Sequence, residues 1–159
     1  VQTQFINRDS GLRIRSLTDP TKKMSKSSED DKSKILLIDN PEVAAKKIMG
    51  ATTDSLASIH FDWENQPGIT NLLQMLSILT GRSQMEVNQE WEGQTRYGDL
   101  KKAVAEVVFD FLSNFQAKFN SISDEILLNK LQESERVLAP IANATLLRAQ
   151  QAVGLRPKA

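Results

Sequence analysis

The sequence predicts a mainly α-helical protein, in which a bundle of four to five helices follows a short strand and loop segment. Two observations favour helices. Apolar residues recur at helical spacing over 69–79 and 104–119, and residues that commonly begin or end helices stand at the borders of such stretches. A third observation separates residues 1–39, which lack this periodicity, from residues 40–159. With 159 residues, of which 40% are hydrophobic and 25% charged, the chain is expected to be globular.

Residues 1–39 are predicted to hold a strand end and a loop. Leu12, Ile14 and Leu17 stand in a polar setting, which is typical of a strand leading out of a sheet, and we expect this strand to be poorly tied down. Residues 21–34 are rich in lysine, serine and acid, which predicts a mobile loop. The apolar run 35–38 fits either a strand or a first helical turn.

Two helices are expected in the first part of the bundle. Asn40 reads as an N-cap followed by Pro41 at the first helical position, and this helix should stop at Gly50. A second helix should begin at Pro67 and end at Gly81. Its apolar residues fall on one helical face, and these are Ile69, Leu72, Leu73, Leu76 and Leu79.

A capping box opens the next helix, and the longest amphipathic stretch follows it. Ser83 and Glu86 have the capping-box spacing, which predicts a short helix as far as Trp91. Asp99 is a plausible cap for the helix after that. This longer helix carries an apolar stripe that we expect to lie in the core, formed by Val104, Val107, Val108, Phe111, Leu112, Phe115 and Phe119.

The final helix is expected between Ser123 and Gly154. Pro140 should kink or interrupt it near Arg136, because the proline ring displaces the carbonyl four residues earlier. Its apolar side chains should pack back on the preceding stripe, and they are Leu127, Leu131, Leu138, Ile141 and Val153.

Composition excludes several classes of protein. The chain has no cysteine, which rules out disulfides and thiolate metal sites and suits a reducing cytoplasm. No apolar run approaches 18 residues and no signal peptide is recognisable, so neither a membrane span nor secretion is supported. The formal net charge is zero, but both ends are mildly basic and the middle is acidic. That distribution suits local polyphosphate contacts and opposes indiscriminate binding to RNA.

The most informative motif is the pentapeptide Lys23-Met24-Ser25-Lys26-Ser27. Two lysines on either side of a small polar turn can place ammonium groups on phosphate oxygens that gain negative charge as a nucleotide is split. The serine hydroxyls add hydrogen-bond donors at low steric cost. The motif therefore predicts a loop that holds a polyphosphate.

The pentapeptide matches the KMSKS signature of the class I aminoacyl-tRNA synthetases, and residues 13–27 resemble its tryptophanyl-tRNA synthetase version. Three further stretches resemble landmarks of the same family in the same order. They are Ala51-Thr52-Thr53-Asp54-Ser55, Pro67-Gly68-Ile69-Thr70-Asn71-Leu72-Leu73 and Tyr97-Gly98-Asp99-Leu100-Lys101. Together the matches cover nearly the whole chain.

The resemblance implies a division of roles along the chain. Residues 1–39 would be the end of a Rossmann-type catalytic domain with its KMSKS loop, and residues 40–159 the helical anticodon-binding domain. Class I synthetases also need an earlier signature of the type His-x-Gly-His. The chain's only histidine is His60, so we expect this chain to be the carboxy-terminal half of a synthetase and inactive alone.

The resemblance also implies substrates and partners. The parent would activate tryptophan with ATP and Mg²⁺ and transfer it to its tRNA in the cytoplasm. We expect no cofactor bound by the fragment and neither membrane nor DNA as a partner. The parent would be a homodimer, and the fragment a monomer.

By resemblance, the residues of the ATP site are Ile14, Lys23, Met24, Ser25, Lys26 and Ser27. Lys23 and Lys26 would be catalytic, stabilising the phosphates while the tryptophan carboxylate attacks the α-phosphorus. Ile14 would give a main-chain contact to adenine. Arg15 stands where we expect an apolar residue, which indicates an open strand face. The acidic stretch 28–31 is expected to pair with the lysines when no nucleotide is bound.

Other readings stay open. His60 is a weak candidate for a base or metal ligand, because no second histidine accompanies it. No metal site and no Ser/His/Asp arrangement is expected. Trp63 and Trp91 fit packing anchors better than platforms for RNA bases, and no residue is assigned to the anticodon. The alternatives to a synthetase fragment are a stand-alone helical RNA-binding or regulatory module and a helical protein-interaction domain.

Overall fold

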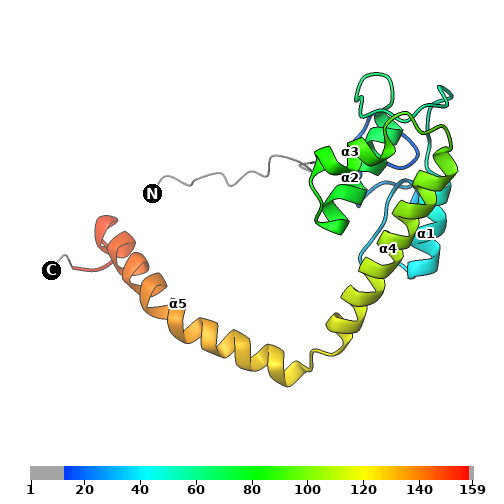
Figure 1. The fold of residues 1–159 in the computed structure, drawn as a ribbon. Helices are drawn as coiled ribbons and strands as arrows, with labels where there is room; N and C mark the ends of the chain where they lie inside the picture. The colour runs from blue at the N-terminus through cyan, green and yellow to red at the C-terminus, as the bar shows by residue number, and fades with distance from the viewer. Residues whose placement is uncertain (1–12, 158–159) are drawn as a thin grey trace. The chain divides into compact units, whose positions relative to one another are not determined.

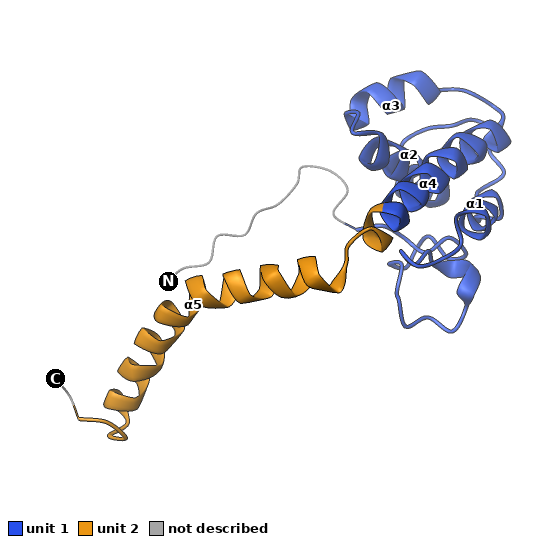
Figure 2. Ribbon diagram, turned by 90° about the horizontal axis from the view of Figure 1, so that it is seen from below, with its two compact units in different colours: residues 1–117 blue, residues 118–159 orange. Residues whose placement is uncertain are grey.

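The computed structural model describes residues 13–157 and divides the chain into two compact units, residues 1–117 and 118–159 (Figures 1 and 2). A short 3₁₀ helix and five α-helices follow one another, which confirms a mainly α fold. They are η1 (Asp31–Ser33), α1 (Pro41–Met49), α2 (Pro67–Thr80), α3 (Gln84–Trp91), α4 (Tyr97–Asn120) and α5 (Asp124–Ala152). The only β pairing among the described residues is an isolated antiparallel bridge between Arg15 and Lys23. No described helix has both the length and the apolar character that crossing a bilayer requires.

The ends of α1 and α2 confirm the predicted start and stop residues. The Asn40 side chain accepts a hydrogen bond of 3.1 Å from the Val43 amide, and Pro41 occupies the first helical position. Gly50 caps the other end of α1. Gly81 ends α2 with a left-handed φ of 71°, a conformation that glycine adopts without steric cost.

The helix α3 opens with the predicted capping box. The Glu86 amide donates to the Ser83 hydroxyl, and the Ser83 amide donates to the Glu86 carboxylate at 2.9 Å. The carboxylate also accepts from the Ser83 hydroxyl, and these bonds hold the pKa of Glu86 below its ordinary value. Two amides at the start of α3 are thus satisfied by side chains.

Replacing Ser83 with alanine is expected to lower the free energy of unfolding by about 1 kcal/mol, because the first turn of α3 loses its cap. Urea denaturation followed by circular dichroism measures the change. Gln89→Ala is the control, since Gln89 is an exposed residue in the same helix. Equal stability of the two variants would contradict a role for the cap.

The helix α4 differs from the sequence prediction at its start and along its stripe. It begins at Tyr97, so Asp99 is not the cap; its carboxylate lies in the first turn and pairs with Arg96 at 2.8 Å. Val104, Val108 and Leu112 are buried as predicted. Phe111 and Phe119 are exposed, which contradicts the expectation of a continuous core face. Phe111 stacks on Phe115 instead.

The helix α5 begins at the predicted cap, with the Ser123 hydroxyl accepting from the Ile126 amide. Pro140 does not interrupt it, but α5 changes direction along its length in Figure 2. Gly154 ends the helix as predicted, with its amide on the Gln151 carbonyl.

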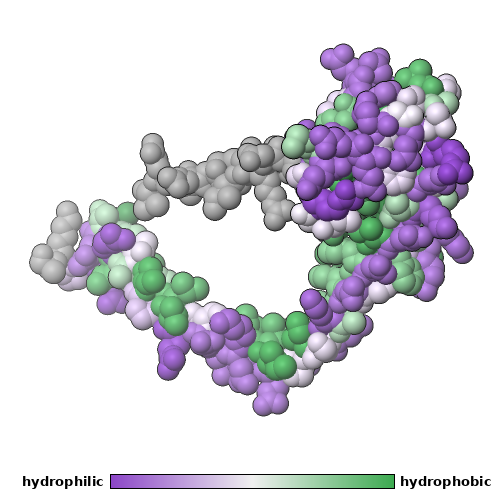
Figure 3. All heavy atoms as spheres, in the orientation of Figure 1, coloured by the Kyte–Doolittle hydropathy of each residue, from purple (hydrophilic) through white to green (hydrophobic). Residues whose placement is uncertain are grey.

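The large apolar side chains of α5 are exposed, and no residue of this helix is buried. The space-filling view shows the resulting apolar surface along the part occupied by α5 (Figure 3). The packing of Leu127, Leu131, Leu138, Ile141 and Val153 on the preceding stripe stays a prediction.

The core of the first unit is built around α2, whose residues 68–77 are all buried. A helix that is covered on every side must lie at the centre of its unit. The buried apolar residues come from the loop before α1 and from α1 to α4, and include Leu17, Ile48, Ile59, Leu72, Val87, Trp91, Val104 and Leu112. Trp91 is thereby a packing anchor, as predicted.

The segment before α1 is held more firmly than its sequence predicts. Leu12 lies outside the described residues. Leu17 is 2% exposed; its amide donates to the Ser33 carbonyl, and its carbonyl accepts from the Thr52 amide at 2.7 Å. The expectation of a poorly tied strand is therefore wrong for this part, because the helical unit supplies the partners that a sheet would provide. Residues 35–38 are neither strand nor helix.

Candidate functional site

The pentapeptide 23–27 begins on the second side of a tight hairpin. The Ser16 amide donates to the Lys22 carbonyl and the Met24 amide to the Ile14 carbonyl, both at 2.9 Å. A turn joins the two sides, closed by the Lys22 amide on the Asp19 carbonyl at 3.0 Å. Proline suits the position after the first residue of such a turn, which Pro20 occupies. The local sequence therefore folds the chain back so that Lys23 lies opposite Arg15.

Asp19 stabilises this turn with its side chain. Its carboxylate pairs with the Lys22 amine at 2.8 Å and accepts hydrogen bonds from the hydroxyl and the amide of Thr21. The bonds from Lys22 and then from Thr21 lower the pKa of Asp19 from 3.8 to about 2. The turn therefore keeps its charged anchor throughout the ordinary pH range.

Acid is expected to loosen the turn in a defined window. Because the pKa of Asp19 is lower in the folded chain, its stabilising contribution is present above the unfolded pKa and disappears as the pH falls through about 2. An NMR titration of the Thr21 amide should show that midpoint. Lys22→Ala should move the midpoint upward, because the Lys22 bond is the largest cause of the low pKa. A midpoint near 4 in the unaltered chain would contradict this account.

The pentapeptide itself ends in a second turn. The Ser28 amide donates to the Ser25 carbonyl at 3.2 Å, and the hydroxyls of Ser25 and Ser27 lie 3.1 Å apart. The amine of Lys34 donates to the Ser28 carbonyl and pairs with Asp31 at 3.3 Å. The Lys34 side chain is only 10% exposed, so it holds the end of the loop from inside the protein.

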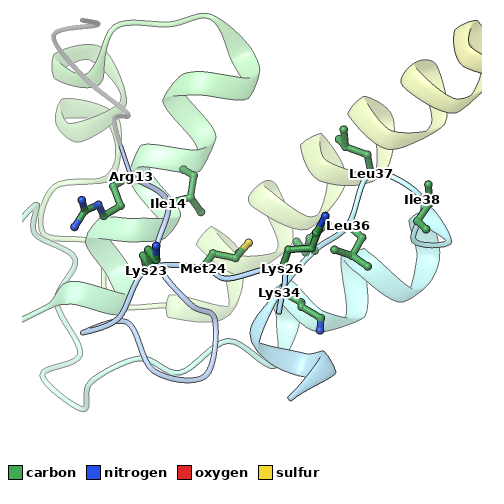
Figure 4. Close-up of a pocket in the computed structure, with 10 residues that line it drawn as sticks. Arg13, Ile14, Lys23, Met24, Lys26, Lys34, Leu36, Leu37 and Ile38 are labelled. Atoms are coloured by element: carbon green, nitrogen blue, oxygen red, sulfur yellow. The ribbon is translucent and has the colours of Figure 1, made fainter. Parts of the chain in front are cut away.

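An open pocket of about 690 Å³ lies between the hairpin and the segment that leads to α1 (Figure 4). Four of the six residues assigned from the sequence line it together, namely Ile14, Lys23, Met24 and Lys26. The opposite segment adds the buried Lys34 and the apolar run, which consists of Ile35, Leu36, Leu37 and Ile38. Apolar walls with a few ammonium groups suit a ligand that has both a flat apolar part and anionic groups.

The two serines of the motif lie elsewhere. Ser25 lines a smaller polar pocket together with Ser16, Thr18, Asp19, Lys22, Lys23, Ser28, Asp30 and Ser33. Ser27 lines neither of these pockets. The structure thus brings Ser25 near Lys23, and it leaves Ser27 as an exposed residue of the turn.

The acids after the motif do not neutralise its lysines. Asp30 accepts from the Thr18 hydroxyl at 2.8 Å and from the Lys32 amide, and Asp31 pairs with Lys34. Within residues 13–157, neither Lys23 nor Lys26 forms an ion pair, and both are exposed. The expected closing pairs are therefore absent from this part of the chain, and both ammonium groups stay available to a ligand.

The other motifs converge in the same unit. The Tyr97 hydroxyl donates to the Asp54 carboxylate at 2.5 Å. The side-chain amide of Gln66 donates to this carboxylate and to the Tyr97 hydroxyl. Burial acts to raise the pKa of Asp54, but the hydrogen bonds from Tyr97, the Leu56 amide and Gln66 outweigh it and leave this pKa lowered. The Lys101 amine donates to the Ala51 carbonyl at 2.8 Å, and burial lowers its pKa. These motifs therefore bind one another, which gives them a structural role.

Arg15 and Trp63 explain an unusual position in the hairpin. The Arg15 guanidinium lies 5.0 Å from the centroid of the Trp63 ring, and it donates to the Thr21 carbonyl at 3.0 Å. This cation–π contact places a cation where a strand buried on both faces would carry an apolar residue. The Trp63 ring lies against the Arg15 guanidinium, and the expectation of an open strand face stays a prediction.

His60 has partners that the sequence does not reveal. Its Nδ1 lies 2.6 Å from the Glu92 carboxylate, and its Nε2 lies 2.8 Å from the Ser58 hydroxyl. The sequence does not reveal this arrangement of Ser58, His60 and Glu92, because Glu92 is far away from His60 in the chain. About half of each of the His60 and Glu92 side chains is exposed, and hydrogen bonds of 2.9 Å link Ile59 to Gln94 and Gly93. The contact thus joins a loop to the end of α3.

Metal ligands do not gather in the described residues. Among residues 13–157, no group of three or more histidine, cysteine or acidic side chains is placed to hold a metal ion. Within this range, His60 forms one ion-pair contact, which is with Glu92. The candidate site is therefore the pocket beside the pentapeptide. Sequence reasoning missed two of its supports. Lys34 is buried by the fold around it, which its local sequence does not reveal. The side chain of Asn71 binds the backbone of Arg15, 56 residues away in the chain.

Comparisons with known proteins agree with the sequence motifs. The family model of class I tRNA synthetases (W and Y) matches residues 2–113. The tryptophan–tRNA ligase of Caldanaerobacter subterraneus subsp. tengcongensis is 46% identical over 145 residues, 91% of this chain and 44% of that relative. The tryptophan–tRNA ligase of Enterococcus faecalis is 42% identical, over 94% of this chain and 45% of that relative.

A solved structure is similar over nearly the whole chain. The crystal structure of tryptophanyl-tRNA synthetase from Mycoplasma pneumoniae matches with a TM-score of 0.82 and 37% identity, covering 96% of this chain and 46% of that one. The chain therefore spans less than half the length of the proteins that it matches.

Proposed function

The chain belongs to the class I tRNA synthetase family, and we propose that it is the carboxy-terminal part of a tryptophan–tRNA ligase. The complete enzyme would activate tryptophan with ATP and transfer it to tRNA. The observation that carries this proposal is the pocket of about 690 Å³ in which Lys23 and Lys26 of the family motif lie beside Ile14. We propose that this part is inactive alone.

We propose that ATP enters the pocket with its adenine against Ile14 and its phosphates towards Lys23 and Lys26. The apolar walls suit the base, and unpaired ammonium groups suit the phosphates. When the tryptophan carboxylate attacks the α-phosphorus, negative charge grows on the departing pyrophosphate. The two lysines would stabilise that charge, so orientation and charge complementarity would lower the barrier without a covalent intermediate on the protein.

We propose that Mg²⁺ arrives bound to ATP. Magnesium is commonly held by nucleotide phosphates and only one or two carboxylates. Residues 13–157 offer no cluster of three or more ligand side chains, which supports this route over a metal cage formed by the chain. The ion would add positive charge beside the phosphates, and the lysines would orient them.

We propose that residues 1–39 contribute to catalysis and residues 40–159 to binding of tRNA near its anticodon. The proposed boundary separates two roles and does not separate two folded units, because Leu17 packs in the same core as α1 and α2. The cysteine-free chain suits the reducing cytoplasm, where we propose that the enzyme acts. We propose a dimeric complete enzyme and a monomeric fragment, which sedimentation would test.

A chimaeric ligase tests the catalytic proposal. This chain replaces the matching carboxy-terminal part of the Caldanaerobacter ligase, which is 46% identical to it. The expected result is tryptophan-dependent exchange of pyrophosphate into ATP, and none from the 159-residue chain alone. A chimaera that folds but fails to exchange, under conditions in which the parent ligase is active, would overturn the proposal.

Binding to RNA tests the second role. The 159-residue chain is titrated with tryptophan tRNA and with the same tRNA carrying a changed anticodon, over a series of salt concentrations. Preference for the natural anticodon would support an anticodon-binding role. Equal, strongly salt-dependent binding would indicate attraction to phosphate only and would contradict that role.

A further inference from the structure

The hairpin that carries Lys23 has one unprotected side. Its two ladder bonds come from Ser16 and Met24, the residues next to the bridged pair Arg15 and Lys23. In an antiparallel pair bonded in this way, the amide and carbonyl of the bridged residues point away from the partner strand. Arg15 therefore directs its own backbone donor and acceptor out of the hairpin, where a sheet would offer a further strand.

The side chain of Asn71 takes the place of that strand. Its Oδ1 accepts from the Arg15 amide at 2.8 Å, and its Nδ2 donates to the Arg15 carbonyl at 3.1 Å. A carboxamide carries a donor and an acceptor in one plane, as a peptide group does. Asn71 is 2% exposed, so water cannot replace it at little cost.

The support behind Asn71 is rigid. It lies in the buried stretch of α2, and three positions earlier Gly68 lies so close to the Thr52 backbone that no Cβ atom would fit between them. The Thr52 amide in turn donates to the Leu17 carbonyl at 2.7 Å. The hairpin is thus fixed to the centre of the helical unit at Arg15 and at Leu17.

We propose that Asn71 is a positioning residue for tryptophan activation, a role that rests on the proposed function. By holding the backbone of Arg15, it sets the places of Ile14 on one side and Lys23 opposite, both of which line the pocket. The Ile14 carbonyl also fixes Met24. Asn71 touches none of the reacting groups itself.

Substitutions separate this role from general stability. Asn71→Ala leaves the Arg15 amide and carbonyl without partners, whereas Asn71→Asp keeps an acceptor but turns a carboxylate oxygen towards the Arg15 carbonyl. The matched control is Ser77→Ala. Ser77 is a buried residue of the same helix, and its hydroxyl donates to the Arg82 carbonyl, remote in sequence from the hairpin.

The first experiment uses the 159-residue chain and limiting trypsin under native conditions. We expect cleavage after Lys22, Lys23 and Lys26 to be about tenfold faster in Asn71→Ala than in the unaltered chain. The loss of a buried hydrogen bond lowers the free energy of local opening, so the opened state that trypsin cleaves becomes more populated. Ser77→Ala should cleave at these sites at the unaltered rate. Equal rates in the two variants would overturn the structural part of the inference.

The second experiment uses the chimaeric ligase and pyrophosphate exchange. Asn71→Ala should lower kcat about tenfold or more, since misplacement of reacting groups is costly, and leave the KM for tryptophan unchanged. Asn71→Asp should behave similarly, and Ser77→Ala should keep full activity. Active chimaeras with equal kcat in Asn71→Ala and Ser77→Ala would overturn the positioning role while the proposed function stands. An inactive unaltered chimaera would overturn both.

Discussion

Replacing Lys26 with alanine in the chimaeric ligase is expected to lower kcat for pyrophosphate exchange by about 100-fold to 1,000-fold, the range found when one group that stabilises transition-state charge is removed. Lys26 is an exposed residue that lines the pocket. It forms no ion pair within residues 13–157, so no carboxylate there competes with a ligand for its ammonium group. The loss should appear in kcat more than in the KM for ATP, because the lysine acts on charge that develops during the reaction.

Lys32→Ala is the matched control for that result. It removes the same charge from the same loop region, but Lys32 is an exposed residue of η1 that lines neither pocket at the motif. The control should keep nearly full activity. If both variants lost activity equally, general electrostatics of the loop would explain the effect, and the specific role of Lys26 would be refuted.

Gly68→Ala is expected to destabilise the chain by about 3 kcal/mol, the upper part of the range for overpacked cores, and to lower the melting temperature by roughly 6 to 12 °C. A Cβ atom at residue 68 would lie 2.2 Å from the Thr52 carbonyl oxygen. That neighbour is backbone, fixed by the bond from the Thr52 amide to Leu17, and cannot rotate away. Thermal unfolding followed by circular dichroism measures the change.

Gly98→Ala provides the comparison. A Cβ atom at residue 98 meets nothing within 4 Å, and this glycine lies in the first turn of α4. Alanine favours helix by about 1 kcal/mol over glycine, so the variant should be as stable as the original or slightly more so. Similar losses in the two variants would show that close packing of α2 against residue 52 is not the cause.

The fold was predictable where neighbouring residues determine it. The caps at Asn40, Ser83 and Ser123 each satisfy an amide three residues away, so the sequence alone places the starts of three helices. Prediction failed where residues distant in the sequence determine the burial or the backbone contacts of a residue. The exposure of Phe119 depends on which elements cover α4, and the firm hold on Leu17 depends on Ser33 and Thr52.

The candidate site divides in the same way. Lys23, Lys26, Met24 and Ile14 are found together because a short hairpin connects them, and the motif reveals the chemistry. Lys34 offers no such signal, since a lysine in a charged loop is ordinarily solvated and its burial depends on the fold around it. The contacts of Asn71 with Arg15 and of His60 with Glu92 span 56 and 32 residues, distances over which spacing carries no information.

The stacking of Arg15 on Trp63 gives the hairpin an optical probe of its own. The chain has two tryptophans, and Trp91 is buried in the core, where it senses global unfolding. Trp63 is partly exposed and lies 5.0 Å from a cation in the hairpin. Any ligand or substitution that shifts residue 15 therefore changes the surroundings of Trp63 and leaves Trp91 as an internal reference. Tryptophan fluorescence from the unlabelled protein thus follows the hairpin in real time.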